Sequence, residues 1–334
     1  MLKMIFAGDI GGTKTNLALY ELRDQSLECV VQHQFASQDY ASFFDVILAF
    51  KKKVEFTTID SVCLGIAGPI IDGRCRTTNL PWDILKSELE IFFGTPKVHL
   101  LNDLEATAYG MLYLNEDEFV NINPSGKVVQ GNRAVIAAGT GLGEAMLFWD
   151  GVQYHTIGCE GGHCDFASAT EQQDELLRWM RHRYVGHVSY ERILSGPGIY
   201  ALYQFLEESG FAPQPEAMIH LQEGADRSAM ISECALVDKD PLCMETLRLF
   251  TEIYGAETGN LALKTMSIGG VYIGGGIAPK ILSMMTGDIF INAFMNKGRF
   301  EEMLRKMEVK ISLNPETALL GAAHYAADKL CINF

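Results

Sequence analysis

Two glycine-rich turns, each set between short apolar runs, constrain the fold of this chain more than any other feature. The turns are Gly8-Asp9-Ile10-Gly11-Gly12-Thr13 and Gly139-Thr140-Gly141-Leu142-Gly143. The segments that follow them have the composition of short strands, and Asp150-Gly151 closes the second. Each turn is therefore predicted to close a β-hairpin and to expose backbone N–H groups that can bind anionic oxygens. We expect positive φ at Gly11 and Gly141.

The occurrence of two such turns indicates a duplicated domain. A single glycine turn is weak evidence for function, because most of them only reverse the chain. Here the turns begin at residues 8 and 139 of a chain of 334 residues, which is long enough for two domains with separate cores. This spacing predicts two related domains that hold a phosphate chain between them.

Charge and composition exclude several functional classes. The formal net charge is −15, which argues against nucleic acid or an anionic membrane as the main partner, because both require a basic surface. No stretch approaches the roughly 18 uninterrupted apolar residues of a membrane-spanning helix. The eight cysteines form no CxxC pair, which favours reduced thiols and a cytoplasmic protein.

The pattern along the chain predicts a mixed α/β fold in each half. In the first half we expect strands over 4–8, 15–22, 28–35, 61–66 and 98–101, helices over 40–54, 84–93 and 104–114, and a loop over 75–82. In the second half we expect a strand pair from residue 133, helices over 171–184 and 196–265 with an amphipathic part over 235–254, and a buried strand before Gly274. A last helix is expected over 315–330.

Several polar residues at predicted loops could carry chemistry, although each has an ordinary structural interpretation. Asn102-Asp103 stands between a buried strand and a helix, where an isolated pair is more often a helix cap. Glu160-Gly161-Gly162-His163 combines a carboxylate and an imidazole in a glycine loop, and Glu191 follows it. Cys159 and Cys164 beside this loop suggest zinc, but without a second ligand pair they are interpreted as small buried residues.

Taken together, these motifs resemble the bacterial glucokinase family within the actin, hexokinase and heat-shock-70 ATPase superfamily. The matching segments are residues 8–13, 101–103, 139–143, 160–166, 187–196 and 274–277, in the order of that family. The resemblance covers nearly the whole chain. It implies an α/β fold of two duplicated RNase H-like domains with an interdomain cleft, the second enlarged by helices. The small domain would be 1–114, with a helix over 315–334 packing back on it, and the large domain 115–314.

The resemblance also implies a function and a set of roles. The protein would transfer the γ-phosphoryl group of ATP to the 6-hydroxyl of glucose, and Asp103 would be the general base. The residues implied to bind glucose are Asn79, Asn102, Asp103, Glu160, His163 and Glu191. The residues implied to bind ATP are Gly8, Asp9, Ile10, Gly11, Gly12, Thr13, Gly139, Thr140, Gly141, Gly143, Gly275 and Gly276. Asp9 would also orient Mg²⁺ through water.

Two residues depart from the family pattern, and two other functions stay open. Lys14 stands where asparagine is commoner, and Glu144 stands where a small apolar residue is commoner. A non-catalytic sugar sensor of the same fold would have no need of the base, yet Asp103 is present. A kinase of another hexose, such as mannose or glucosamine, is the second alternative. Similar proteins imply a cytoplasmic homodimer with glucose and ATP as ligands, and no nucleic-acid or membrane partner.

Overall fold

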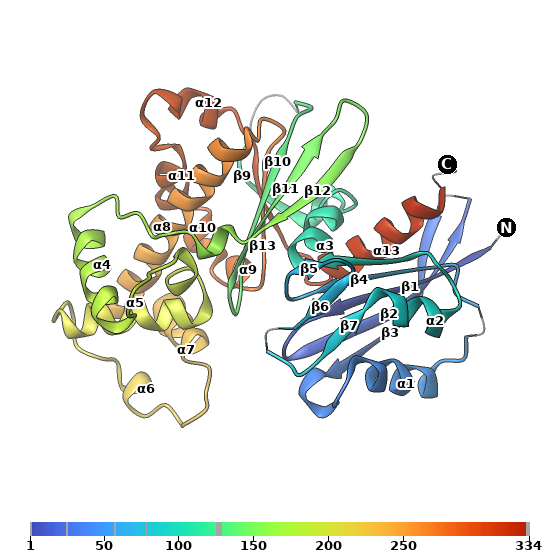
Figure 1. Ribbon diagram of the computed structural model, residues 1–334. Coiled ribbons are helices and arrows are strands. Elements are labelled where there is room, and N and C mark those ends of the chain that lie inside the picture. Colours follow the sequence, from blue (N-terminus) through green and yellow to red (C-terminus); the bar gives the residue numbers. More distant parts are fainter. Residues whose placement is uncertain (1, 25, 57, 78, 125–128, 332–334) are drawn as a thin grey trace. The chain divides into compact units, whose positions relative to one another are not determined.

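The computed structural model describes residues 2–24, 26–56, 58–77, 79–124 and 129–331, which form two compact α/β units (Figure 1). The first unit comprises Met1–Glu118, Thr156–Gly158 and Asn314–Phe334, and the second comprises Phe119–His155 and Cys159–Leu313. The expected domain boundaries at residues 114 and 314 stay a prediction. Residues 332–334 of the expected last helix lie outside the described part of the chain.

The first unit is built on a five-stranded sheet in the order β3-β2-β1-β4-β8. Strands β1 (Lys3–Ile10), β2 (Lys14–Arg23) and β3 (Ser26–Ala36) are antiparallel neighbours. Strands β4 (Ser61–Ile66) and β8 (Val98–Asn102) continue the sheet parallel to β1. The predicted strands are thus confirmed, with ends shifted by at most two residues.

Alternation along β1 determines which helices cover each face of this sheet. Phe6 and Ile10 pack in a core with α1 (Phe43–Lys53) and α2 (Lys86–Phe93). Ile5 and Ala7 face the opposite way, toward α3 (Asp103–Gly110) and α13 (Thr317–Cys331). The last helix and α3 approach so closely that a Cβ on Gly110 or Gly321 would overlap the backbone of the other helix.

A second, three-stranded sheet in this unit corrects the expectation of a loop over 75–82 and of a helix from residue 84. Its strands are β5 (Ile70–Ile71), β6 (Arg74–Arg76) and β7 (Asp83–Leu85). Ile84 and Leu85 pair with β6, so the helix begins only at Lys86. Strands of two or three residues are too short to give a periodic pattern in the sequence.

The second unit repeats the central order of the first sheet, a hairpin followed by parallel strands. Its six strands run β12-β11-β10-β13-β14-β9. Strands β10 (Arg133–Ala138) and β11 (Leu142–Trp149) form the hairpin, and β13 (Val271–Gly274) and β14 (Val309–Ser312) continue it in parallel. Strands β9 (Phe119–Asn123) and β12 (Tyr154–Cys159) lie at the edges. The predicted mixed α/β class is confirmed.

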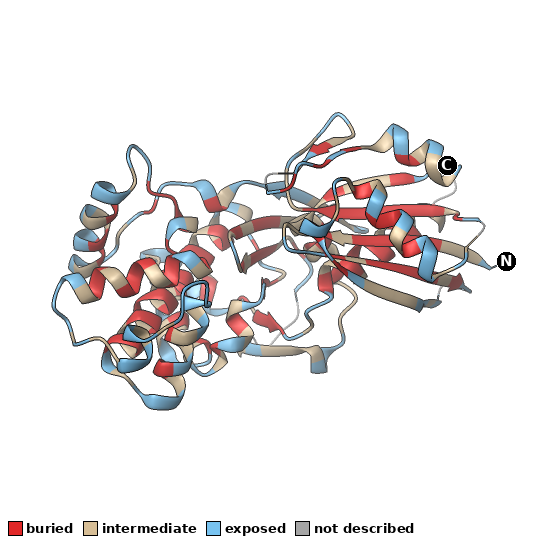
Figure 2. Cartoon of the chain, turned by 90° about the horizontal axis from the view of Figure 1, so that it is seen from below, coloured by how far each residue is buried: buried red, intermediate tan, exposed pale blue. Residues whose placement is uncertain are grey.

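Helices form the rest of the second unit, around the long helix α8 (Pro241–Thr265) (Figures 1 and 2). The others are α4 (Glu171–Arg183), α5 (Gly196–Glu208), α6 (Glu216–Ile219), α7 (Arg227–Glu233), α9 (Ile277–Lys280), α10 (Leu282–Met285), α11 (Asp288–Met295) and α12 (Glu301–Arg305). The expectation of one amphipathic helix over 235–254 is wrong. A π-helical turn over Cys234–Asp238 interrupts it, and α8 is buried on several sides because α5 and α11 both pack against it.

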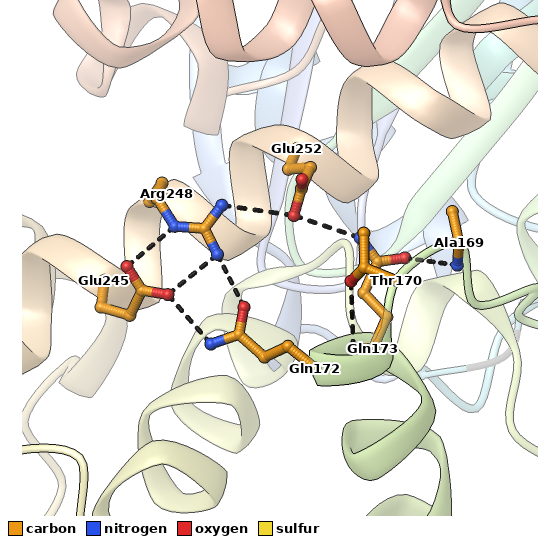
Figure 3. A network of polar contacts seen from close by, with 7 residues as sticks. All are labelled: Ala169, Thr170, Gln172, Gln173, Glu245, Arg248 and Glu252. Carbon is orange, nitrogen blue, oxygen red and sulfur yellow. Dashed lines mark hydrogen bonds and ion pairs between the residues drawn. The ribbon is translucent and has the colours of Figure 1, made fainter.

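A polar network joins α4 to α8 within this unit (Figure 3). The Arg248 guanidinium donates to both carboxylate oxygens of Glu245, at 2.8 Å each, and to Gln172 Oε1 at 2.7 Å. Gln173 Nε2 donates to Glu252 across the same junction, at 3.2 Å.

Among the described residues, no helix combines the length and apolar character needed to cross a membrane.

Candidate active site

The first glycine turn is held by hydrogen bonds that leave two N–H groups available. Gly11 N–H donates to the Lys14 carbonyl at 2.9 Å and closes the turn between β1 and β2. Ser37 fixes the turn from outside, because its hydroxyl donates to the Gly11 carbonyl at 2.8 Å and its N–H to the Thr13 carbonyl at 3.0 Å. In the described chain, the N–H groups of Gly12 and Thr13 donate to no other backbone group.

The second turn has the same design in its own unit. Gly139 N–H donates to the Gly141 carbonyl at 2.8 Å, and Gly196 N–H donates to the Gly139 carbonyl at 2.8 Å. The next N–H, of Leu142, is bound by Glu191 Oε2 at 3.0 Å. Within the described residues, Thr140 and Gly141 keep N–H groups without a backbone acceptor. Each hairpin thus presents two adjacent donors, a pattern that suits phosphate oxygens.

The expectation of positive φ at Gly11 and Gly141 is wrong, since neither is among the glycines with that conformation. Glycine is required at position 141 because there is no room for a side chain: a Cβ there would stand 2.5 Å from Glu191 Oε2. Positive φ occurs at Gly275, with φ of 79°, where a Cβ would also overlap the Ala138 carbonyl. Gly276 follows with open space around it. Gly275 therefore lets the chain turn tightly at the end of β13.

Asp9 lies on β1 just before the first turn, and two side-chain amides form a row of hydrogen bonds that ends at its carboxyl. Gln34 Nε2 donates to Asn16 Oδ1 at 3.0 Å, and Asn16 Nδ2 donates to Asp9 Oδ2 at 3.3 Å. Burial raises the pKa of the Asp9 carboxyl, and the bond from Asn16 partly offsets this. A desolvated carboxylate oriented by an amide fits a hard cation such as Mg²⁺. The neighbours Gly8 and Ile10 are buried in β1, where both pair with β2 and with β4.

Asn102 and Asp103 share the start of α3 with different tasks. Asn102 is the helix cap: its Oδ1 accepts from Leu104 N–H at 2.9 Å, and its N–H donates to Glu105 at 3.0 Å. Its Nδ2 donates to the Gly68 carbonyl at 3.1 Å. Asp103 is the first helical residue, half-buried, where the helix N-terminus stabilises negative charge. Asn102 therefore serves as the helix cap that an isolated Asn-Asp pair predicts, and Asp103 is the better candidate for a catalytic role.

Asn79 lies beside the first turn in the same unit. A Cβ on Gly12 would stand 3.0 Å from the Asn79 Cβ, and both residues line a small cavity with Ile10 and Ala67. Thr77 orders the loop, because its hydroxyl donates to the Leu80 carbonyl at 2.9 Å. The structure therefore brings Asn79 together with the Gly11-Gly12 turn.

The Glu160-Gly161-Gly162-His163 loop forms a 3-10 turn over Gly161–His163, seated on β11. Both glycines are required, because a Cβ on Gly161 would overlap the Glu144 carboxyl and one on Gly162 would overlap the Leu142 carbonyl. The side chains of Glu160 and His163 are exposed. Cys159 and Cys164 are also exposed, which corrects the expectation that they are buried. Cys159 ends the edge strand β12, and Cys164 follows the turn.

One functional candidate was not assigned from the sequence. In the sequence, Glu144 differs from the small apolar residue that is commoner in the family. In the structure, its side chain is buried directly beneath Gly161. The alternation of β11 contains a signal, because Glu144 shares a face with Leu142, whose carbonyl touches the same turn. Sequence alone does not show that Glu257 of α8 is buried near it, 113 positions further on.

Comparison with solved structures places this fold among sugar kinases. Glucokinase from an Antarctic psychrotroph matches with a TM-score of 0.84 at 31% identity, over 98% of this chain and 99% of that one. A ROK family glucokinase from Streptomyces griseus, solved in complex with glucose and AMPPNP, matches with a TM-score of 0.67. It is 20% identical over 98% of this chain and 100% of that one, which establishes a common fold.

Sequence comparison gives the family. The family model described as Glucokinase matches residues 6–329. Glucokinase of Nostoc punctiforme is 37% identical over 339 residues, covering 98% of this chain and 99% of the relative. The chain therefore belongs to the glucokinase family, which confirms the resemblance seen in its motifs.

Proposed function

We propose that this protein phosphorylates the 6-hydroxyl of glucose with ATP, giving glucose 6-phosphate and ADP. The observation that carries the proposal is the pair of equivalent hairpin turns, each with two adjacent N–H donors, in a chain that also contains Asp103 at a helix start. Family membership over almost the full length supports the same activity.

Asp103 acts as the general base in this proposal. Its carboxylate accepts the proton of the 6-hydroxyl while that oxygen attacks the γ-phosphorus of ATP, and the bond to the ADP oxygen breaks. Asn102 anchors the start of α3 through its three hydrogen bonds and so fixes the direction of Asp103. Asn102 contributes to glucose affinity as well, according to the family resemblance.

The remaining sugar contacts are assigned to Asn79, Glu160, His163 and Glu191. Exposed carboxylate and imidazole groups on a fixed turn suit a polyol, since each hydroxyl can donate or accept a hydrogen bond. Glu191 differs from the others, because one carboxylate oxygen already accepts from Leu142 N–H of the second turn. We infer that Glu191 links sugar binding to the conformation of the nucleotide turn.

The nucleotide is assigned to the two turns and to Gly275-Gly276. Gly12, Thr13, Thr140 and Gly141 supply the N–H donors. The backbone at Gly276 has room for a ligand, because no atom lies within 4 Å of a Cβ position there. Asp9 would hold hydrated Mg²⁺, which neutralises charge on the phosphate oxygens when bound. A cytoplasmic homodimer is part of the proposal, as the family resemblance implies.

A coupled assay of ADP release tests the proposal against its alternatives. The purified protein is mixed with Mg²⁺-ATP and glucose, mannose, glucosamine or galactose in turn. Release that depends on glucose supports the glucokinase proposal, and preference for mannose or glucosamine replaces it with another hexose kinase. Glucose binding by calorimetry without release of ADP identifies a sugar sensor instead.

A further inference from the structure

The carboxyl group of Glu144 is enclosed beneath the turn that carries Glu160 and His163. Glu144 lies on β11, opposite Ile136 of β10, and its side chain is 1% exposed. Its carboxyl occupies the place where a Cβ of Gly161 would stand. In the described structure, Glu144 Oε1 is buried and receives no hydrogen bond. A buried polar atom without a partner is costly, and more so when it is charged.

The groups around Glu144 disfavour its ionised form. On α8 it faces Glu257, which is fully buried and bonded to Asn260 Nδ2 at 2.8 Å and Lys264 Nζ at 3.3 Å. Burial and the charge of Glu257 raise the pKa of Glu144 to about 7, although Lys264 opposes the shift. Its other titratable neighbours are Tyr254 of α8 and Cys159, whose thiol donates to the Glu144 carbonyl at 3.4 Å. Lys297 faces Glu257 and Lys264.

We propose that Glu144 is a positioning residue, whose protonated carboxyl seats the turn Gly161–His163 and so controls the affinity for glucose. Ionisation places a charge against Gly161 with no donor for Oε1. The turn must then move to admit water, and Glu160 and His163 move with it. The inference rests on the proposed role of these two residues in sugar binding.

The direction of the pH effect follows from which form binds glucose. The protonated form holds the turn in place, so the KM for glucose is constant below the pKa of Glu144 and rises above it. Linkage of a single proton limits the rise to about tenfold per pH unit. Because Asp103 lies outside the turn, kcat changes much less than KM over the same range.

Steady-state kinetics between about pH 6 and pH 8.5, which brackets the shifted pKa, provide the first test. In the wild type the KM for glucose rises above neutrality. In Glu144→Gln and Glu144→Met, which cannot ionise, this rise is lost. Glu223→Gln removes a carboxylate from an exposed loop of the same unit and keeps the wild-type profile. The other titratable groups of the turn are common to all four proteins, so their difference isolates Glu144.

A second measurement does not depend on turnover. In the ligand-free protein labelled with ¹⁵N-glycine, the amide signals of Gly161 and Gly162 shift with pH in the wild type and stay constant in Glu144→Gln. Constant signals in the wild type would overturn the proposal, as would a KM profile that survives in both non-ionisable variants. An enzyme that phosphorylates no hexose at any pH contradicts the proposed function, and the glycine signals still test Glu144.

Discussion

Glycine at position 141 is explained by a neighbouring side chain rather than by its backbone. The Glu191 carboxylate approaches the turn to bind Leu142 N–H, and only a residue without Cβ leaves room for it. Gly139 begins the same turn with no atom within 4 Å of a Cβ position and no positive φ. Two glycines of one motif therefore have different structural requirements, and a pair of alanine variants separates them.

Gly141→Ala should weaken binding of both ligands, because the new methyl group displaces Glu191 from Leu142 N–H. Loss of a hydrogen bond to a charged group is worth about 1.5–3 kcal/mol, so we expect dissociation constants to rise roughly tenfold or more. Gly139→Ala should bind nearly as the wild type does. Calorimetric titration with glucose and with a non-hydrolysable ATP analogue measures both variants. Equal affinities in the two variants would contradict the proposed contact.

Asp103→Asn should remove the base while keeping the shape of the side chain. We expect kcat to fall by roughly 10²–10⁴-fold, the usual contribution of general base catalysis, with glucose binding much less affected. Glu105→Gln is an informative comparison, because Glu105 completes the cap of α3 through Asn102 N–H. The fall in kcat of Glu105→Gln should be smaller, and part of the effect should appear as lower stability of the fold. Near-normal turnover of Asp103→Asn would exclude the assigned role.

At the scale of elements, the sequence predicts those strands and hairpins that have a clear apolar run or a glycine turn. Both hairpins and strand β4 lie where the pattern places them, because apolar runs and turn residues act locally. The strands of the short sheet β5–β7 have only two or three residues each, too few to give a periodic pattern. The π-helical turn before α8 has no pattern of its own in the sequence either. In the candidate site, the motifs predict Asp103 as the general base, which stays a prediction, whereas the burial of the Glu144 carboxyl is visible only in the packing of Gly161 against β11.

The junction of α4 and α8 should depend on Arg248 more than on other arginines of these helices (Figure 3). Arg248→Ala removes the guanidinium from Glu245 and from Gln172 Oε1, and leaves Glu245 only the bond from Gln172 Nε2. We expect a loss of about 1–3 kcal/mol in the free energy of unfolding. Arg178→Ala, on an exposed position of α4, should change it by less than about 0.5 kcal/mol. Urea denaturation compares the two, and equal midpoints would show that the network contributes nothing.

At the scale of the whole molecule, the two units share the hairpin-and-parallel order of their sheets but carry different candidate residues. Asp9, Asn102 and Asp103 lie in the first unit, and the Glu160–His163 loop and Glu191 lie in the second. The net charge of −15 is not concentrated in the turns, which offer neutral N–H donors for phosphate.

Glucose should raise the melting temperature, because a ligand that binds only the folded protein stabilises it by mass action. At roughly 100 times its dissociation constant the gain is about 2.7 kcal/mol, which corresponds to a rise of several degrees. Galactose differs from glucose at the 4-hydroxyl, which the family resemblance assigns to Asn102 and Asp103, so it should give little shift. Differential scanning fluorimetry makes this comparison without a phosphoryl donor. Equal protection by the two sugars would contradict the proposed specificity, and Asp103→Asn, which keeps hydrogen bonding but not the base, should still be protected by glucose.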